Sequence, residues 1–341
     1  MKKTLIVSVV GFIIVLAIAG FGLAACGGDD DNTAHTHIYS TTWSSNATQH
    51  WKECTVAGCD AKTETANHAP ADGICTTCGY DNTEGNNNTP IEMEMVSIPA
   101  GTLSWKNWDI EVIITLSAFK IGKFEVTQEQ YQAVMGTNPS YYNSRPAVGE
   151  VQNKRPVERV TWFDAVEFCN KLSTKEGLTP VYEITERTPA TGYPIKAATV
   201  TATWENNGYR LPTEAQWEYA CRAGTTTNWH FSDYDTELAN YAWYWHNSNQ
   251  ITHEVGKKTA NAWGLYDMHG NIAEMCWDWY VNANTIPTSD QTDYKGPDNG
   301  IGRAARGGSY WDEASESCSY KRNYCTPGVG GNRLGFRVVL P

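Results

Sequence analysis

Two cysteine pairs have the spacing of metal ligands. Cys54 and Cys59 form a C-x4-C pair, and Cys75 and Cys78 form a C-x2-C pair. Four such thiolates can hold zinc tetrahedrally. A unit as small as residues 35–80 cannot bury enough apolar surface to fold stably and needs a metal site or cross-links of this kind. In an oxidising compartment the same cysteines would form two disulfides instead. Structural zinc and disulfides therefore stay open as alternatives, and neither is catalytic.

A second chemically rich stretch lies near the end of the chain. It begins after Arg306-Gly307-Gly308-Ser309-Tyr310, where the double glycine permits backbone conformations closed to other residues. It ends before residues 336–340, which the pattern predicts to be a strand. Between these ends lie aromatic, hydroxyl and charged side chains without apolar periodicity. This pattern favours a recognition surface, with an ordinary polar loop as the alternative.

Three aromatic residues in this stretch offer flat contact area and lose little side-chain entropy on binding, as in antibody loops. They are Trp311, Tyr320 and Tyr324. A few such anchors usually dominate binding energy. The charged residues are expected to tune the charge preference of the site more than its affinity. The residues expected to do so are Asp312 and Lys321, and Glu313 is a further candidate contact.

The bulk composition narrows the class of protein. The 341 residues allow one large domain and a small one, or two modest domains. The formal net charge of −12 argues against a general nucleic-acid binder. The chain has 14 Trp and 18 Tyr, whose rings can be buried while the indole N–H or phenol O–H reaches a hydrogen-bond partner.

The N-terminus has the pattern of a targeting segment. Lys2 and Lys3 precede an apolar run over residues 5–23, which closes with Leu-Ala-Ala before Cys26. The run resembles a bacterial lipoprotein signal over residues 1–25, with Cys26 acylated. An uncleaved membrane anchor is the alternative. Either way the sequence predicts an envelope protein tethered to a membrane, and we expect the outer-membrane surface.

Further along, the composition divides the chain. Residues 26–34 are a polar tether, 35–80 a small Cys/His-rich unit, 81–90 a linker, and 91–341 one folded domain. Alternating patterns predict strands over 109–116 and 118–126. Thr-x-x-Gln or Thr-x-x-Asp boxes at Thr127, Thr161 and Thr213 predict three helix starts. The domain is therefore expected to be α+β with few helices and much irregular chain.

These segments resemble the family of formylglycine-generating enzymes and sulfatase-modifying factors. The matching runs include Arg-Leu-Pro-Thr-Glu-Ala-Gln-Trp-Glu at 210–218 and Gly-Leu-Tyr-Asp-Met-His-Gly-Asn at 264–271. The other matching runs lie at 96–101, 121–127, 155–165, 306–310 and 335–337. The resemblance covers nearly all of 91–341 and implies a C-type-lectin-like fold with a small central sheet, few helices and long irregular loops.

The resemblance also locates where catalysis would occur. The family's enzymes place two copper-binding cysteines in the segment after Gly-Gly-Ser. Those two positions fall on Asp312 and Ser317 here, while Cys318 is one residue away. A carboxylate and a hydroxyl do not replace a soft dithiolate. No copper is expected, and the chain is predicted not to be an enzyme.

Within this fold, the chain resembles the variable proteins of diversity-generating retroelements, such as the variable lipoproteins of Treponema-type spirochaetes. Their segment from Arg-Gly-Gly-Ser to Gly-Phe-Arg is rewritten at adenines of asparagine codons. The resemblance makes about 306–341 the variable segment. The implied contacts reachable by such changes are Asp312, Ser315, Ser317, Ser319, Tyr320, Asn323 and Tyr324.

The resemblance also implies a calcium site. Asp267 and Glu274 would supply side-chain oxygens, and Gly270 and Ile272 main-chain oxygens. Hard oxygen ligands from a tight turn suit calcium, and a hydrogen-bonded turn without metal is the alternative.

The sequence thus predicts a surface-displayed, lipid-anchored protein that binds an unknown protein or glycan ligand. One alternative is a formylglycine-generating oxidase acting on a sulfatase cysteine. The other is a purely structural envelope lipoprotein.

Overall fold

The computed structural model describes residues 44–45, 49–53, 62–67, 91–106, 110–282 and 287–341. The chain divides into two compact units, residues 1–89 and 90–341. In the first, β1 (Ser44–Ser45), β2 (Gln49–Glu53) and β3 (Lys62–Asn67) form an antiparallel sheet in that order. The signal segment with Cys26 and the four paired cysteines lie outside the described residues, as do the whole predicted tether and linker.

In the second unit the three predicted helix starts are confirmed. The helices are α2 (Gln128–Met135), α3 (Trp162–Lys175) and α4 (Glu214–Arg222), and each begins with a complete capping box on its threonine. The Thr oxygen accepts a backbone N–H while the third residue reaches back, so two otherwise unpaired donors are satisfied. A short helix, α5 (Leu238–Tyr241), follows the 3-10 turn η3 (Asp235–Glu237). The other 3-10 turns are η2 (Gln152–Lys154) and η4 (Ala314–Ser317).

Four small sheets complete the unit. The largest has the order β13-β12-β10-β14, formed by Asn323–Cys325, Gly302–Arg306, Ala273–Tyr280 and Leu334–Gly335. A second runs β15-β7-β4, formed by Val339–Leu340, Phe119–Gly122 and Met95–Ile98. A third runs β11-β6-β5, formed by Gln291–Thr292, Glu111–Leu116 and Gly101–Lys106. The fourth pairs β8 (Tyr182–Thr188) with β9 (Ala197–Ala202).

The predicted final strand over 336–340 is only partly right. Regular pairing begins at Val339, because the carbonyls of Phe336 and Val338 bond singly to the N–H groups of Val126 and Gly122. Phe336 and Val338 belong to the buried core. The strand predicted over 118–126 is likewise shorter, since it ends at Gly122.

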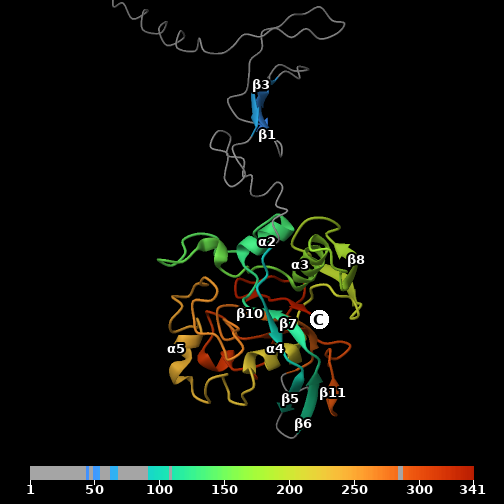
Figure 1. The fold of residues 1–341 in the computed structure, drawn as a ribbon, viewed down its shortest axis with the longest axis vertical. Coiled ribbons are helices and arrows are strands. Elements are labelled where there is room, and N and C mark those ends of the chain that lie inside the picture. Colours follow the sequence, from blue (N-terminus) through green and yellow to red (C-terminus); the bar gives the residue numbers. More distant parts are fainter. Residues whose placement is uncertain (1–43, 46–48, 54–61, 68–90, 107–109, 283–286) are drawn as a thin grey trace, which may run out of the picture. The chain divides into compact units, whose positions relative to one another are not determined.

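The core lies between α2, α3 and the β10 sheet. Tyr131 of α2 stacks on Phe168 of α3 with 5.6 Å between ring centroids, and both rings contact Phe336. Trp162 donates its indole N–H to the Cys276 carbonyl of β10 at 2.8 Å, which satisfies its buried polar tip. Figure 1 shows α2 and α3 at one end of this unit and β5, β6 and β11 at the other.

Long irregular segments connect these few elements, so the predicted α+β, C-type-lectin-like class is confirmed. In the described part of the chain, no helix combines the length and apolar character that crossing a membrane requires.

Candidate functional site

A buried arginine holds the main chain of the C-terminal segment from beneath. Arg306, at the end of β12, is fully buried and donates to the carbonyls of Lys321 (2.6 Å) and Ser319 (3.1 Å). Its guanidinium also forms an ion pair with Glu218 of α4. Charge-assisted bonds of this kind are stronger than neutral ones. The position of residues 319–321 is therefore fixed by Arg306 of β12, which Glu218 of α4 holds in place.

A second arginine continues this framework. Arg322 donates from Nε and an Nη to the two carboxylate oxygens of Glu214, at 2.8 and 2.7 Å. Burial opposes the charge, but the Glu214 carboxylate outweighs it and raises the pKa of Arg322. Glu214 and Glu218 both lie on α4, so that helix pairs with both Arg322 and Arg306.

The start of the segment is held by close backbone packing. Gly308 has φ of +69°, and a Cβ there would lie 3.0 Å from the Glu316 carbonyl oxygen, so only glycine fits without strain. The Ser309 hydroxyl donates to Asp312 at 2.6 Å, and Arg333 approaches the other Asp312 oxygen at 3.3 Å. Asp312 thus links the two ends of the segment.

Most of the predicted contact side chains point outward. Trp311, Tyr320 and Tyr324 keep 41, 49 and 47 % of their surface exposed. The Trp311 ring packs edge-on against Trp245, with centroids 4.9 Å apart. The other exposed positions are Glu313, Ser315 and Asn323, with Asp312 and Lys321 half-buried.

Ser317 and Ser319 correct the prediction, because both are buried. The Ser317 hydroxyl donates to the Ala314 carbonyl at 2.8 Å, and its own carbonyl lies 2.7 Å from Nδ1 of His269. The Ser319 main chain bonds to Asn228 and Arg306. These two residues support the loop and present no side chain to a ligand. Residue type alone gave no signal of this, since serine is common both inside and outside.

The exposed residues fall into groups. Glu313 lies 3.0 Å from His246, on the side of the segment that carries Trp311. Tyr320 and Lys321 line a pocket. Tyr324 stacks on Tyr280 with ring centroids 5.0 Å apart.

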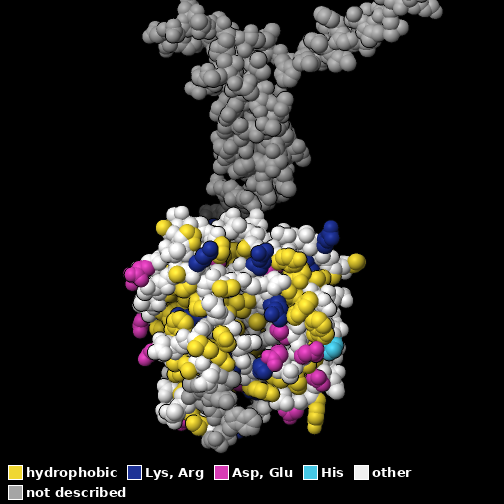
Figure 2. All heavy atoms as spheres, turned by 180° about the vertical axis from the view of Figure 1, so that it is seen from behind, with side chains coloured by type: hydrophobic (Ala, Val, Ile, Leu, Met, Phe, Trp, Pro, Cys, Tyr) yellow, Lys and Arg dark blue, Asp and Glu magenta, His cyan; other side chains and the backbone are white. Residues whose placement is uncertain are grey.

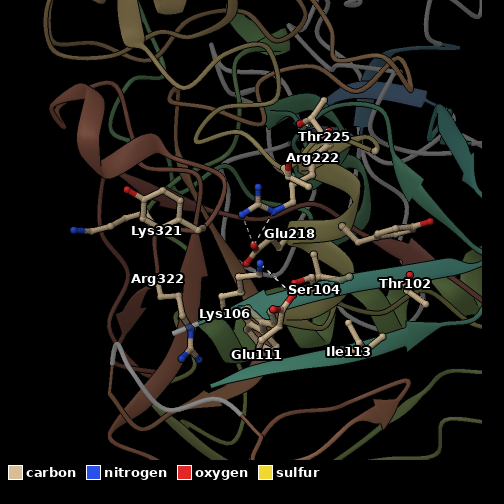
Figure 3. A pocket seen from close by; sticks show the side chains of 16 residues that line it. Thr102, Ser104, Lys106, Glu111, Ile113, Glu218, Arg222, Thr225, Lys321 and Arg322 are labelled. Carbon is tan, nitrogen blue, oxygen red and sulfur yellow. Dashed lines mark hydrogen bonds and ion pairs between the residues drawn. The ribbon is translucent and has the colours of Figure 1, made fainter. Parts of the chain in front are cut away.

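The pocket has a volume of about 1000 Å³. One wall is strand β5, the opposite wall is the C-terminal part of α4 with residues 224–226, and residues 320–322 close one end. Figure 3 shows Thr102, Ser104 and Lys106 facing Glu218, Arg222 and Thr225 across this space. Sequence reasoning missed the β5 wall, because more than 200 residues separate it from the segment it meets.

The positions that correspond to the family's cysteines carry no thiol. Asp312 is engaged by Ser309 and Arg333, and Ser317 is buried. The neighbouring Cys318 is also buried, and burial raises the pKa of its thiol. All described cysteines are free, so Cys318 forms no disulfide with Cys325.

The predicted calcium ligands are arranged around an arginine instead. Both Glu274 oxygens accept from Arg337, each at 2.6 Å, and one also accepts from the Trp217 indole at 2.7 Å. One Asp267 oxygen accepts from the Gly256 N–H at 2.7 Å, while the other has no hydrogen-bond partner among the residues that the structure describes. Burial raises the pKa of Asp267 to about 6.

In this arrangement Glu274 does not fit a calcium ligand, because the guanidinium already neutralises it. Gly270 and Ile272 offer only main-chain oxygens, so Asp267 is the one remaining charged donor of the predicted set. Among the residues that the structure describes, no group of three or more His, Cys, Asp or Glu is placed to hold a metal ion. Calcium binding itself stays a prediction.

Comparisons with known proteins agree with this architecture. The family model described as "Sulfatase-modifying factor enzyme 1-like domain" matches residues 81–341. The solved structure of Treponema denticola variable protein 1 is 42 % identical, with a TM-score of 0.67 over 72 % of this chain and 94 % of that one.

Two curated relatives carry different names. The "Chaperone protein LppX" of Paenibacillus barcinonensis is 35 % identical over 290 aligned positions, and the match covers 78 % of this chain and 96 % of that protein. A formylglycine-generating enzyme of Thermomonospora curvata is 27 % identical over 305 aligned positions, and the match covers 73 % of this chain and 94 % of that protein.

Proposed function

We propose, for a chain that belongs to the sulfatase-modifying factor enzyme 1-like family, a role in ligand recognition rather than catalysis. The recognition surface is the C-terminal segment, within about residues 306–341. One observation carries this proposal: Arg306 and α4 hold the segment's main chain from the interior, while Trp311, Tyr320 and Tyr324 stay exposed. Exposed rings on a rigid backbone lose little entropy when they bind.

The residues at the family's catalytic positions argue against oxidase chemistry. Asp312 holds the loop together, and Ser317 has a buried hydroxyl. Neither can supply the soft thiolate pair that activation of oxygen by copper would need.

The likeness to the Treponema variable protein supports a variable recognition site. A replacement at an exposed position changes the chemistry offered to a ligand and leaves the buried bonds of the main chain intact. The proposed ligand is a protein or a glycan. The negative formal charge disfavours nucleic acid, and in Figure 2 Lys and Arg side chains are scattered among acidic and apolar ones.

The proposed location is the cell envelope, with acylated Cys26 as the membrane anchor and the outer-membrane surface as the site of display. Support comes from the pattern Leu23-Ala24-Ala25-Cys26 after the apolar run. Mass spectrometry of the membrane-extracted protein tests this, because it distinguishes an N-terminal diacyl- or triacyl-cysteine from an intact signal segment.

Sequencing the gene from many isolates tests variable recognition. We expect substitutions at the exposed positions 315, 320, 323 and 324, and none at Arg306, Gly308, Glu214 or Glu218. A neighbouring reverse-transcriptase gene with an adenine-biased template would add support. A uniform segment across isolates would favour the structural envelope role. Copper-dependent conversion of a cysteine-containing peptide by the purified protein would restore the oxidase.

A chaperone role is the second candidate, and the 35 % identity to the Paenibacillus protein with that name favours it. It predicts that the purified chain suppresses aggregation of a chemically unfolded secreted enzyme at stoichiometric ratio. A recognition protein predicts no such effect on an unselected client.

A further inference from the structure

The pocket beside the C-terminal segment contains an open sheet edge. Strand β5 is the last strand in the order β11-β6-β5, so only one of its two edges is paired. An unpaired edge presents a row of N–H and C=O groups that can accept another strand. The pocket is lined by Thr102, Leu103, Ser104, Trp105 and Lys106, which are five of the six residues of β5.

The contacts of β6 show which β5 residues face this edge. Ile113 donates its N–H to Asp290 at 2.9 Å, and the carbonyl of Thr115 accepts from the Asp293 N–H at 2.8 Å. The main-chain N–H and C=O groups of these two β6 residues therefore point away from β5. In an antiparallel pair, when the main-chain groups of one residue point away from the partner strand, those of the residue opposite point away from the pair as well. Ser104 lies opposite Ile113 and Thr102 opposite Thr115. By the same alternation, the main-chain groups of Lys106 also point to the open edge.

The outward main-chain groups of Thr102, Ser104 and Lys106 make no hydrogen bond with any residue that the structure describes. Thr102 and Lys106 are exposed, and Ser104 is half-buried. Within the described part of the chain, no neighbouring element therefore covers this edge. The pocket of about 1000 Å³ separates it from Arg222 and residues 224–226.

Charges in the pocket are mostly satisfied internally. Arg222 pairs with Glu218 at 2.8 Å, Lys106 with Glu111 at 3.2 Å, and Lys321 with Glu316 at 2.8 Å. A ligand bound by one strong charge would need an uncompensated partner here. The regular feature that the pocket offers is instead the row of main-chain donors and acceptors of β5, whose two-residue repeat matches the backbone of an extended polypeptide.

We propose that the ligand contributes an extended polypeptide segment that pairs with the open edge of β5 as an additional strand. This deepens the proposed recognition function and rests on it. The β5 main chain binds the ligand backbone whatever its sequence, while Tyr320 and Lys321 at the end of the pocket contact its side chains. Replacement of these two residues would then change which segment binds and would keep the mode of binding.

The test uses the full chain and a phage-displayed pool of random linear decapeptides. A selected peptide is resynthesised with each backbone amide N-methylated in turn. Strand pairing predicts loss of affinity at every second amide, about 3- to 10-fold for each bond removed, and little change at the amides between. This measurement uses the wild-type protein, so no variant needs to fold.

A matched pair of variants tests the protein side. Both Ser104→Pro and Ser104→Ala remove the hydroxyl that donates to Glu111 and leave the main-chain pairing with β6, but only Ser104→Pro also removes the outward N–H. We expect at least 3-fold weaker peptide binding for Ser104→Pro and unchanged binding for Ser104→Ala, provided the melting temperature of the proline variant is near that of the wild type. If the proline variant does not fold, the N-methyl scan decides alone.

Three results would overturn the inference: no peptide is selected, N-methylation has no two-residue period, or a folded Ser104→Pro binds normally. A glycan array run in parallel separates this failure from failure of the proposed function. A glycan bound through Tyr320 but unaffected by Ser104→Pro would refute strand pairing and keep the recognition surface. If Tyr320→Ser changes the binding of no peptide and no glycan, both fail.

Discussion

Replacement of Arg306 by methionine separates the support of the segment from its exposed contacts. The arginine is fully buried, donates to two main-chain carbonyls and pairs with Glu218. Removing one partner of a buried ion pair costs about 3–5 kcal/mol. Glu218 keeps Arg222, and Glu214 keeps Arg322, so the loss lies at the low end, about 3–4 kcal/mol.

That loss is a large part of a typical domain stability of about 5–15 kcal/mol. For a unit of this size, 1 kcal/mol corresponds to about 2–4 °C in melting temperature. We therefore expect Arg306→Met to melt about 6–16 °C below the wild type. Differential scanning calorimetry of the full chain measures this, and limited proteolysis should show new cleavage within residues 310–330.

Tyr320→Ser is the matched control, because it changes an exposed side chain of the same segment. Its free energy of unfolding should stay within about 0.5 kcal/mol of the wild type. If Arg306→Met melts within about 2 °C of the wild type, or Tyr320→Ser is equally destabilising, the segment is not held in the way described.

Three further predictions concern other parts of the fold. Burial raises the pKa of Asp278 to about 7. Between about pH 4 and 7 the folded chain therefore keeps a proton on Asp278 that the unfolded chain has lost, so the free energy of unfolding falls as the pH rises through this range. Relative to Asp278→Asn, the wild type should lose about 2–3 kcal/mol between pH 5 and 7 in urea unfolding, and parallel pH profiles would contradict this. Because Arg337 neutralises Glu274, millimolar calcium or EDTA should shift the melting temperature by less than about 2 °C; a large stabilisation by calcium would show that the ion displaces the guanidinium. Thr213→Ala should cost about 1 kcal/mol in urea unfolding through loss of the α4 cap, and an unchanged midpoint would mean that the cap contributes nothing.

The features that the sequence predicts best are local. The capping boxes at Thr127, Thr161 and Thr213 each lie within four consecutive residues, so their chemistry can be read without the fold. The left-handed glycine at 308 belongs to the same class, because backbone conformation limits the residue type directly.

Features that depend on distant partners were missed for a physical reason. Glu274 has the residue type of a calcium ligand, but only the fold brings Arg337 to it from 63 positions away. Ser317 and Ser319 have hydroxyls that suit either a ligand or a buried carbonyl. Their burial depends on how the loop folds over His269 and Arg306, which no local pattern encodes.

The same separation explains how one segment can combine a fixed shape with changeable chemistry. The bonds that fix residues 319–322 end on main-chain carbonyls or on Arg322, and they come from Arg306 and α4. A new side chain at position 320 or 324 leaves those bonds in place, whereas a new residue at 306 removes several together. Substitutions at well-separated exposed positions should therefore add nearly independently in stability. Coupling between them should appear only in binding, where neighbouring side chains meet one ligand.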